Sequence, residues 1–308
     1  MGYSIMGIYF YIQEEAGTMD ASELKEKLSK LSIWKKNGQR APHKPLLILL
    51  ALAQLQQNHT ALPYEFVREK LKKLLMEFGP PRRSYHPEEP FVRLTTDGIW
   101  RLSDPVDKKH FSDKQLLVEQ VEGGFSEEVL ALLQHNEAVM QELAELLLNE
   151  HFPETIHQDI LDEISLDFSA RKLRRRDPGF RNRILKAYEY SCAVCGFNVR
   201  LGDTLVGVDA AHIQWHQAGG PDIEENGIAL CSLHHKMFDR GVFMITPERE
   251  LLVAEQAHGT HGFQEWLMHY HGKPIRSPIH PAYTPKEIFI QWHVKEVFRE
   301  PARYRRAP

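Results

Sequence analysis

Cysteine is scarce in this chain of 308 residues, which has only three, and all three lie within residues 192–231. A disulfide between them is disfavoured, because nothing in the sequence indicates export and disulfides are rare in the cytosol. No apolar run reaches the length of a transmembrane helix. The apolar opening, MGYSIMGIYFYIQ, has no basic start and is followed by acids, unlike a signal peptide. These absences predict a cytoplasmic protein without membrane segments, in which residues 1–19 are a leader or a loose strand.

A net positive charge is also absent. The formal net charge is −4, so the chain as a whole gives no nucleic-acid signal. The positive charge is instead concentrated locally, with seven cations just before the cysteine segment: Arg171, Lys172, Arg174, Arg175, Arg176, Arg181 and Arg183. A charge run is usually a solvated face. Its position next to the motifs described below favours contact with phosphate groups.

The cysteines follow a pattern that predicts a structural zinc site. Cys192 and Cys195 form a Cys-x-x-Cys pair, and Cys231 and His234 repeat the same gap. Zinc favours four sulfur or nitrogen ligands in a tetrahedron, and pairs at this spacing reach that geometry from one tight turn. Three buried free thiols are the alternative, but this alternative does not explain two matching gaps with no cysteine left over.

A second set of polar residues, His212, Asn226 and His235, is interleaved with the first. Hydrolysis of a phosphodiester needs an activated water, a cation on the phosphate oxygens and help for the leaving oxygen. A neutral imidazole, with a pKa near ~6.5, suits the role of base. Its other ring nitrogen needs an acceptor, such as Asn226 or a backbone carbonyl. His235 and Asp239 are four residues apart, which would place both on one helix face for binding one divalent cation.

Residues 180–245 resemble the zinc-knuckle subgroup of HNH (ββα-metal) nucleases, through DAAHI, ENGIALC and HHKMFD. The resemblance implies that His212 is the general base, Asn226 holds the loop or the base in place, and His235 binds a catalytic Mg²⁺ or Mn²⁺. Many members have a metal-binding Asp or His directly before the base, where this chain has Ala211. His235 is therefore a stronger candidate ligand than Asp209 or Asp239.

The residues before this segment predict a helical module that ends in a hairpin. The apolar run 46–55 is typical of a buried core helix, with Pro45 in its first turn. In residues 91–102, FVRLTTDGIWRL, Asp97-Gly98 predicts a two-residue turn between β-strands. Helices followed by a hairpin favour a winged-helix-like α/β module. Further helices are expected over residues 20–35, 64–78, 126–150 and 285–299, and residues 151–170 are expected to form a linker with a short acidic helix.

RAPHKPLLILLAL (40–52) and SYHPEEPFVRLTTDGIWRL (84–102) resemble the sulfur-binding domain of phosphorothioate-dependent HNH restriction endonucleases of the McrA type. The resemblance covers roughly residues 20–160. It implies a small pocket for the phosphorothioate sulfur, formed by a proline and apolar neighbours, with basic residues on the adjacent DNA backbone. Pro90 is the matching proline, with Tyr85 or Phe91 as the apolar wall, although Glu89 replaces an aromatic residue. The candidate DNA contacts are Arg40, His43, Lys44, Arg82, Arg83, Arg93, Arg174, Arg175 and Arg176.

The sequence therefore predicts an α+β protein with a DNA-reader domain at residues 20–160 and an HNH nuclease domain at residues 161–308. The expected function is a modification-dependent restriction endonuclease acting on double-stranded, phosphorothioate-modified DNA. Since one HNH domain has one site, we expect double-strand cleavage to need either a homodimer or two binding events. Two alternatives stay open. The reader could take a flipped, methylated base between Tyr85, Phe91 and Trp100, or the chain could be a DNA-binding regulator with an inactive nuclease domain.

Overall fold

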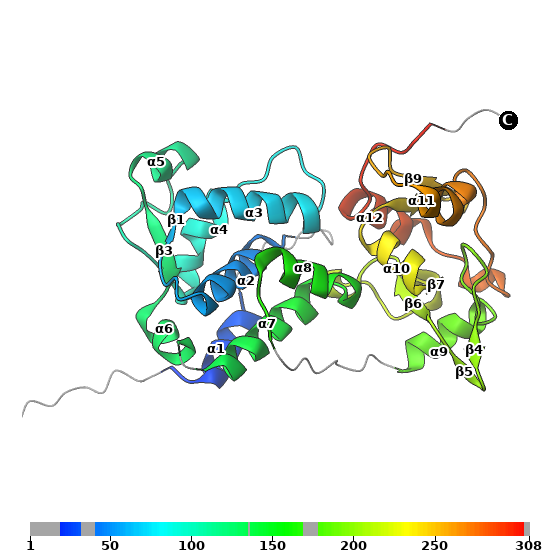
Figure 1. The fold of residues 1–308 in the computed structure, drawn as a ribbon, viewed down its shortest axis with the longest axis horizontal. Helices are drawn as coiled ribbons and strands as arrows, with labels where there is room; N and C mark the ends of the chain where they lie inside the picture. The colour runs from blue at the N-terminus through cyan, green and yellow to red at the C-terminus, as the bar shows by residue number, and fades with distance from the viewer. Residues whose placement is uncertain (1–18, 32–40, 135, 169–177, 305–308) are drawn as a thin grey trace, which may run out of the picture.

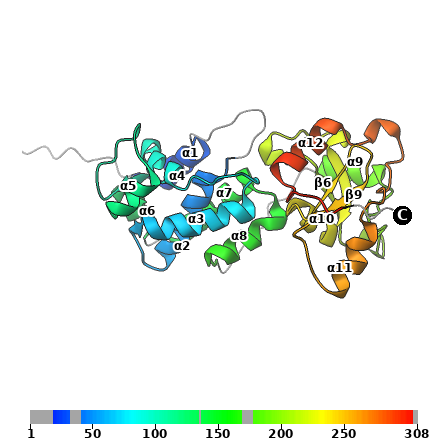
Figure 2. The ribbon, with the colours of Figure 1, turned by 90° about the horizontal axis from the view of Figure 1, so that it is seen from above.

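The computed structural model describes residues 19–31, 41–134, 136–168 and 178–304. They form two lobes that lie side by side, as Figures 1 and 2 show. The leader and six of the expected DNA-contacting or phosphate-contacting residues lie outside the described residues: Arg40, Arg171, Lys172, Arg174, Arg175 and Arg176. Within the described residues, no helix combines the length and the apolar character needed to cross a lipid bilayer.

The N-terminal lobe is mainly helical. Its core helix is α2 (His43–Gln56), which is apolar around its whole circumference and packs against α3, α4 and α7. This confirms the buried helix predicted over the apolar run. The other helices are α1 (Ala21–Ser29), α3 (Tyr64–Phe78), α4 (Glu88–Arg93), α5 (Asp113–Val118), α6 (Glu127–Leu133), α7 (Glu137–His151) and α8 (His157–Ile164), with the 3-10 helices η1 (Leu94–Asp97) and η2 (Glu154–Ile156).

A small antiparallel sheet closes one end of this lobe. Its strands are β1 (Leu62–Pro63), β2 (Trp100–Leu102) and β3 (Glu122–Phe125), in the order β1-β3-β2. The hairpin predicted over residues 91–102 is therefore wrong, because α4 and η1 occupy residues 88–97 and β2 pairs with β3. Gly98 has φ 71° and caps the end of η1. An Asp-Gly pair is thus a helix end here, since glycine also favours the left-handed conformation after a helix.

Two further predictions for this lobe are corrected. The helix expected over residues 126–150 is two helices, and the Asn136 side chain starts the second by accepting a hydrogen bond from the Val139 amide at 3.2 Å. The short acidic helix expected within residues 151–170 is present as α8, but the segment is not a linker, because Ile160 of α8 is fully buried in the lobe's core. The end of the N-terminal lobe is therefore built by the segment that was expected to be a linker.

The C-terminal lobe is organised around one ββα unit. Strands β6 (Val208–His212) and β7 (Gly227–Cys231) pair antiparallel, with His212 opposite Gly227, and α10 (Ser232–Asp239) follows directly. Helix α9 (Pro178–Ala187) packs so closely on this hairpin that a Cβ on Gly227 would lie 2.2 Å from Ile184 Cδ1. The remaining elements are β4 (Arg200–Leu201), β5 (Thr204–Leu205), β8 (Phe243–Ile245), β9 (Leu251–Val253), α11 (His261–Trp266), α12 (Glu287–Glu296), η3 (His216–Ala218), η4 (Glu224–Asn226), η5 (Met268–Tyr270) and η6 (Pro281–Tyr283).

The two lobes meet through apolar and charged contacts. Trp215 and Trp292, from the C-terminal lobe, pack into the hydrophobic cluster of the N-terminal lobe. Arg240 of the C-terminal lobe lies 4.6 Å from the ring centroid of Phe78, at the end of α3. Helix α10, which carries candidate site residues, therefore packs directly against the other lobe.

Candidate active site and zinc site

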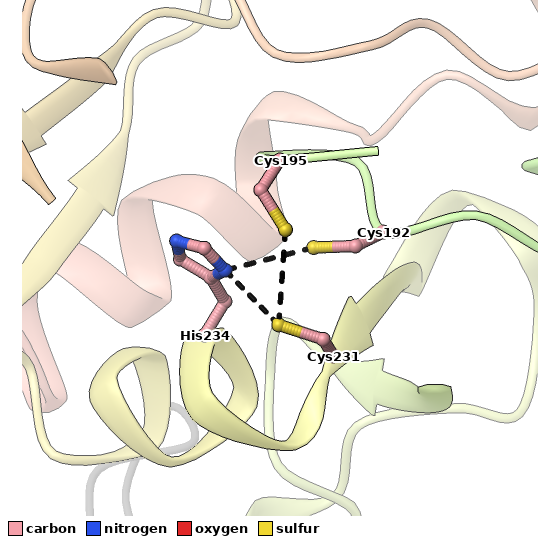
Figure 3. A group of neighbouring side chains, drawn as sticks. All are labelled: Cys192, Cys195, Cys231 and His234. Atoms are coloured by element: carbon pink, nitrogen blue, oxygen red, sulfur yellow. Dashed lines mark hydrogen bonds between the residues drawn. The ribbon is translucent and has the colours of Figure 1, made fainter. Parts of the chain in front are cut away.

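The predicted zinc ligands lie together beside the ββα unit. Cys192 and Cys195 come from the turns after α9, Cys231 ends β7, and His234 lies in the first turn of α10 (Figure 3). Their four ligand atoms lie within 4.8 Å of one another. The Cys195 and Cys231 sulfurs are 3.9 Å apart, close to the roughly 3.8 Å between two sulfurs bound tetrahedrally at about 2.3 Å from zinc. This donor set fits a structural zinc ion.

The electrostatics of this group also favour a cation. Burial alone lowers the pKa of His234, but hydrogen bonds with Cys192 and Cys231 outweigh burial and raise the pKa to about 9. Hydrogen bonds from Cys195 and Cys231 hold the pKa of the Cys192 thiol far below its usual range. A thiolate is therefore favoured at Cys192, and the thiolate is the form that binds metals. The His234 Nε2 atom lies 2.8 Å from the Trp266 carbonyl oxygen, which directs Nδ1 towards the sulfurs.

Two residues of the second set, His212 and His235, face a cavity of about 350 Å³ between the two lobes. From the C-terminal lobe, the cavity is lined by His212, Asp222, His235 and Asp239 among others. The N-terminal lobe contributes Asn149, Pro153, Glu154 and His157. The sequence motifs predicted that His212, His235 and Asp239 share one site, but the contribution of the other lobe is visible only in the tertiary structure.

His212 lies at the end of β6, and its acceptor is a residue that sequence reasoning missed. The Nε2 atom is 2.7 Å from Asp222 Oδ1, and the Phe180 ring stacks on the imidazole at 4.0 Å. Asp222 is therefore a partner of this ring that was not among the expected acceptors, Asn226 or a backbone carbonyl. The signal was present in the sequence as an acid between the base histidine and Asn226, within a Gly-Gly-Pro-Asp turn.

Asn226 is fully buried and holds the loop that carries Asp222. Its Oδ1 atom accepts from the Gln214 amide at 2.8 Å, and its Nδ2 donates to the carbonyl oxygens of Gln214 and Pro221, each at 3.0 Å. Gly220 completes this loop, since a Cβ there would lie 1.9 Å from the Gln214 carbonyl oxygen. These bonds fit a loop-holding role for Asn226 and fix the position of Asp222 beside the imidazole.

His235 and Asp239 lie one turn apart on α10, and both are almost fully buried. The His235 Nε2 and Asp239 Oδ2 atoms are 3.3 Å apart. Two adjacent ligands at about 2.1 Å from one octahedral cation would be roughly 3.0 Å apart. The pair therefore fits a single divalent cation. Trp215 Nε1 donates to Asp239 Oδ1 at 3.1 Å, and the Thr155 hydroxyl donates to Oδ2.

Asp209 does not belong to this group. Side chains alternate along a strand, so Asp209 lies on the face of β6 opposite to His212 and is not among the residues that line the cavity. Its carboxylate is half-exposed and pairs with Arg181 Nε at 2.6 Å. The expectation that Asp209 is a catalytic-metal ligand is therefore corrected.

Several side chains of the N-terminal lobe that were expected to contact DNA are instead buried or paired with acids of this protein. Lys44 is buried and pairs with Asp97 at 2.6 Å. Arg82 reaches the other lobe, where its guanidinium pairs with the buried Glu296 at 2.8 Å. Burial, with help from the nearby charges of His86 and Arg82, lowers the pKa of His43 to about 4, so this imidazole is neutral at physiological pH.

The expected sulfur pocket also needs correction. Pro90, the proline expected to form the pocket, lies in α4 and is buried. Phe91 has no exposed surface, because its ring packs 4.9 Å from that of Tyr64 and 6.1 Å from that of Trp100. The aromatic pocket of the methylated-base alternative is not formed either, since Phe91 and Trp100 are core residues. Of these aromatic residues, Tyr85 is partly exposed, although its hydroxyl accepts from the Arg82 amide at 3.3 Å.

Two of the remaining candidate cations reach the surface. Arg83 is exposed. Arg93 is also exposed, forms an ion pair with Glu89 and lies over the Phe111 ring at 5.6 Å. Both can meet a phosphate backbone without leaving a buried charge unpaired.

Comparison with known families matches each lobe separately. Residues 21–169 match a family described as ScoMcrA-like, DNA sulfur-binding domain, and residues 192–246 match the HNH endonuclease family. Among solved structures, a sulfur-binding domain of SprMcrA complexed with phosphorothioated DNA is 19% identical, covering 48% of this chain and 96% of that chain, with a TM-score of 0.42. The modification-dependent TagI restriction endonuclease is 24% identical, covering 38% of this chain and 37% of that chain, with a TM-score of 0.29. No curated protein matches the chain.

Proposed function

The chain joins a ScoMcrA-like DNA sulfur-binding domain to an HNH endonuclease domain, and from this we propose that it is a phosphorothioate-dependent restriction endonuclease. The fold class and the nuclease class expected from the sequence are confirmed by these two domains. The N-terminal domain would bind modified double-stranded DNA, and the HNH domain would hydrolyse a phosphodiester nearby.

The observation that carries the proposal is the gathering of His212, Asp222, His235 and Asp239 around one cavity. With Nε2–H donating to Asp222, the lone pair of the neutral His212 ring lies on Nδ1, which would accept a proton from the attacking water. The Asp222 carboxylate would then stabilise the imidazolium. A divalent cation held by His235 and Asp239 would neutralise charge on the phosphate oxygens and help the leaving oxygen.

We assign Zn²⁺ to the Cys192, Cys195, Cys231 and His234 group, and Mg²⁺ or Mn²⁺ to His235 and Asp239. Sulfur-rich tetrahedra select zinc, whereas oxygen and nitrogen donors suit harder cations. We draw the domain boundary within residues 169–177, because Leu166 belongs to the N-terminal core and Phe180 to the C-terminal core. We further propose that the protein acts in the cytoplasm, and that two copies cooperate to cut both strands.

For the reader surface, we propose that Arg83, Tyr85 and Arg93 face the DNA. All three are at least partly exposed, on or near one segment of the N-terminal lobe. Sulfur is larger, softer and less hydrated than phosphate oxygen, so a shallow apolar wall favours it. Tyr85 can supply such a wall. Arg174, Arg175 and Arg176, just before the nuclease domain, stay predicted phosphate contacts.

The test uses two duplexes of identical sequence, one of which carries a single phosphorothioate linkage. Wild-type protein with Mn²⁺ should bind and cleave the sulfur duplex in preference to the plain one. His212→Ala should lose roughly 10²-fold or more in cleavage rate and keep its affinity for both duplexes. Equal binding of the two duplexes would contradict the reader assignment. A zinc-loaded wild type that cleaves neither duplex would contradict the nuclease assignment.

A further inference from the structure

The carboxylate of Asp239 is held by donors from both lobes of the protein. Trp215, from its own lobe, donates to Oδ1 at 3.1 Å. Thr155, from the sulfur-binding domain, donates through its hydroxyl to Oδ2. Oδ2 is also the atom that lies 3.3 Å from His235 Nε2. The sulfur-binding domain therefore touches the oxygen that faces the proposed metal position.

The position of Thr155 is fixed by the core of its own lobe. It lies in the middle of η2, between the long helix α7 and helix α8. Its neighbour Ile156 is buried in the core, and the buried His157 bonds through Nε2 to the Phe152 carbonyl oxygen at 2.8 Å. Thr155 therefore presents its hydroxyl from a rigid support that packs against α10.

A donor at this oxygen is compatible with metal binding. Each carboxylate oxygen has two lone pairs, so Oδ2 can accept the Thr155 hydrogen bond and still bind a cation. Hydrogen bonds to a ligating carboxylate fix its orientation, and their loss weakens metal affinity or activity by about 10–100-fold. With donors on both oxygens, the plane of the Asp239 carboxylate is set before a cation arrives.

We propose that Thr155 is a positioning residue of the nuclease metal site, contributed in cis by the sulfur-binding domain. Its hydroxyl orients Asp239 towards the cation shared with His235, so the metal site is complete only when the two lobes are docked. This inference rests on the proposed nuclease function and adds a physical link between the DNA-reading domain and the catalytic metal.

The test measures Mn²⁺ binding by calorimetry and by electron paramagnetic resonance, using the full chain with its zinc in place. Thr155→Val keeps the side-chain shape but removes the hydroxyl, and we expect roughly 10-fold or greater loss of Mn²⁺ affinity. Thr155→Ser keeps the hydroxyl and should stay near the wild-type value. His235→Ala identifies the site, because it should abolish this Mn²⁺ binding.

Asp159→Asn is the matched control for general loosening of the lobe contact. It removes the 2.7 Å ion pair between α8 and Lys236 of α10, but it leaves the Asp239 carboxylate untouched. Its Mn²⁺ affinity should equal that of wild type. An equal loss in Asp159→Asn and Thr155→Val would overturn the proposal, since the effect would then come from docking alone.

Other outcomes are equally decisive. Unchanged Mn²⁺ affinity in Thr155→Val, with affinity lost in His235→Ala, would overturn the role of Thr155 and leave the nuclease function intact. Faster cleavage of unmodified DNA by Thr155→Val would also overturn it, because Thr155 would then restrain the site. If wild type and His235→Ala bind Mn²⁺ identically, the proposed nuclease function fails together with this inference.

Discussion

Arg82→Ala should destabilise the contact between the two lobes rather than weaken DNA binding. Arg82 forms two hydrogen bonds, at 3.0 and 2.8 Å, to the carboxylate of Glu296 in α12. The side chain of Glu296 is only 1% exposed, whereas that of Arg82 is 32% exposed. Removing the guanidinium would take both of these hydrogen bonds away from a carboxylate that is buried at the lobe interface.

The expected magnitude follows from this asymmetry. Breaking a buried ion pair by removing one partner costs about 3–5 kcal/mol. Because Arg82 is partly exposed, its loss would let water approach Glu296, and we expect about 2–3 kcal/mol. With about 2–4 °C of melting temperature per kcal/mol for domains of 150–250 residues, this corresponds to roughly 4–12 °C. Combining Glu296→Gln with Arg82→Ala should restore part of the lost free energy of unfolding, because a neutral amide is less costly to bury than a carboxylate.

The assay is differential scanning calorimetry of wild type, both single variants and the double variant, which together form a double-mutant cycle. We expect a coupling free energy of about 1.5–3 kcal/mol. Arg83→Ala is the matched control, because Arg83 is the exposed neighbour. It should leave the melting temperature unchanged and flatten the slope of log K against log salt by about one unit. Equal melting temperatures for Arg82→Ala and Arg83→Ala, or strictly additive effects in the cycle, would refute this reasoning.

Three further predictions concern the zinc site, the base and the reader core. Cys195→Ala should lose zinc and unfold the C-terminal lobe, because structural zinc supplies folding free energy; metal analysis and circular dichroism check this, and a folded, zinc-free variant would contradict it. Asp222→Asn should lower the single-turnover cleavage rate roughly 10–100-fold with unchanged DNA affinity; an unchanged rate would remove Asp222 from the site. The folded pKa of His43, about 4, lies below the unfolded value of 6.5, so below pH 6.5 the unfolded state binds more protons and stability falls as the pH falls towards 4. In urea titrations, the free energy of unfolding should therefore fall by about 2–3 kcal/mol more between pH 7 and 4.5 in wild type than in His43→Gln. Equal decreases in the two proteins would contradict the lowered pKa of His43.

The sequence by itself predicted which three cysteines and one histidine gather into a possible metal site, and it carried the motif of the HNH endonuclease family. Cys192 and Cys195 share one turn, and Cys231 and His234 another, so their spacing almost dictates the geometry. The buried helix α2 could also be predicted from the sequence, because a helix that is apolar all round must be covered on every side. These features depend on residues that are near one another along the chain.

The predictions that were wrong concern local sequence patterns that are compatible with two different structures. Asp97-Gly98 is typical of a hairpin turn, but here it ends a 3-10 helix. Phe91 and Leu94 are three residues apart and both fully buried, which a helix achieves by placing them on one face. Lys44 and Arg82 were expected to contact DNA because a cation in a DNA-reader module is a natural phosphate contact. Local sequence does not show that an acid distant in the chain already neutralises the charge.

Only the tertiary structure decided which distant groups meet. Thr155 and Asp239 are 84 residues apart, and Arg82 and Glu296 are 214 residues apart. Both pairs depend on how the two lobes pack, with η2 against α10, and that packing buries surfaces such as those of Trp215 and Trp292. The spacing of residues close together in the sequence predicted the chemistry of the nuclease site. Its contact with the N-terminal lobe depends on long-range packing, which no local pattern encodes.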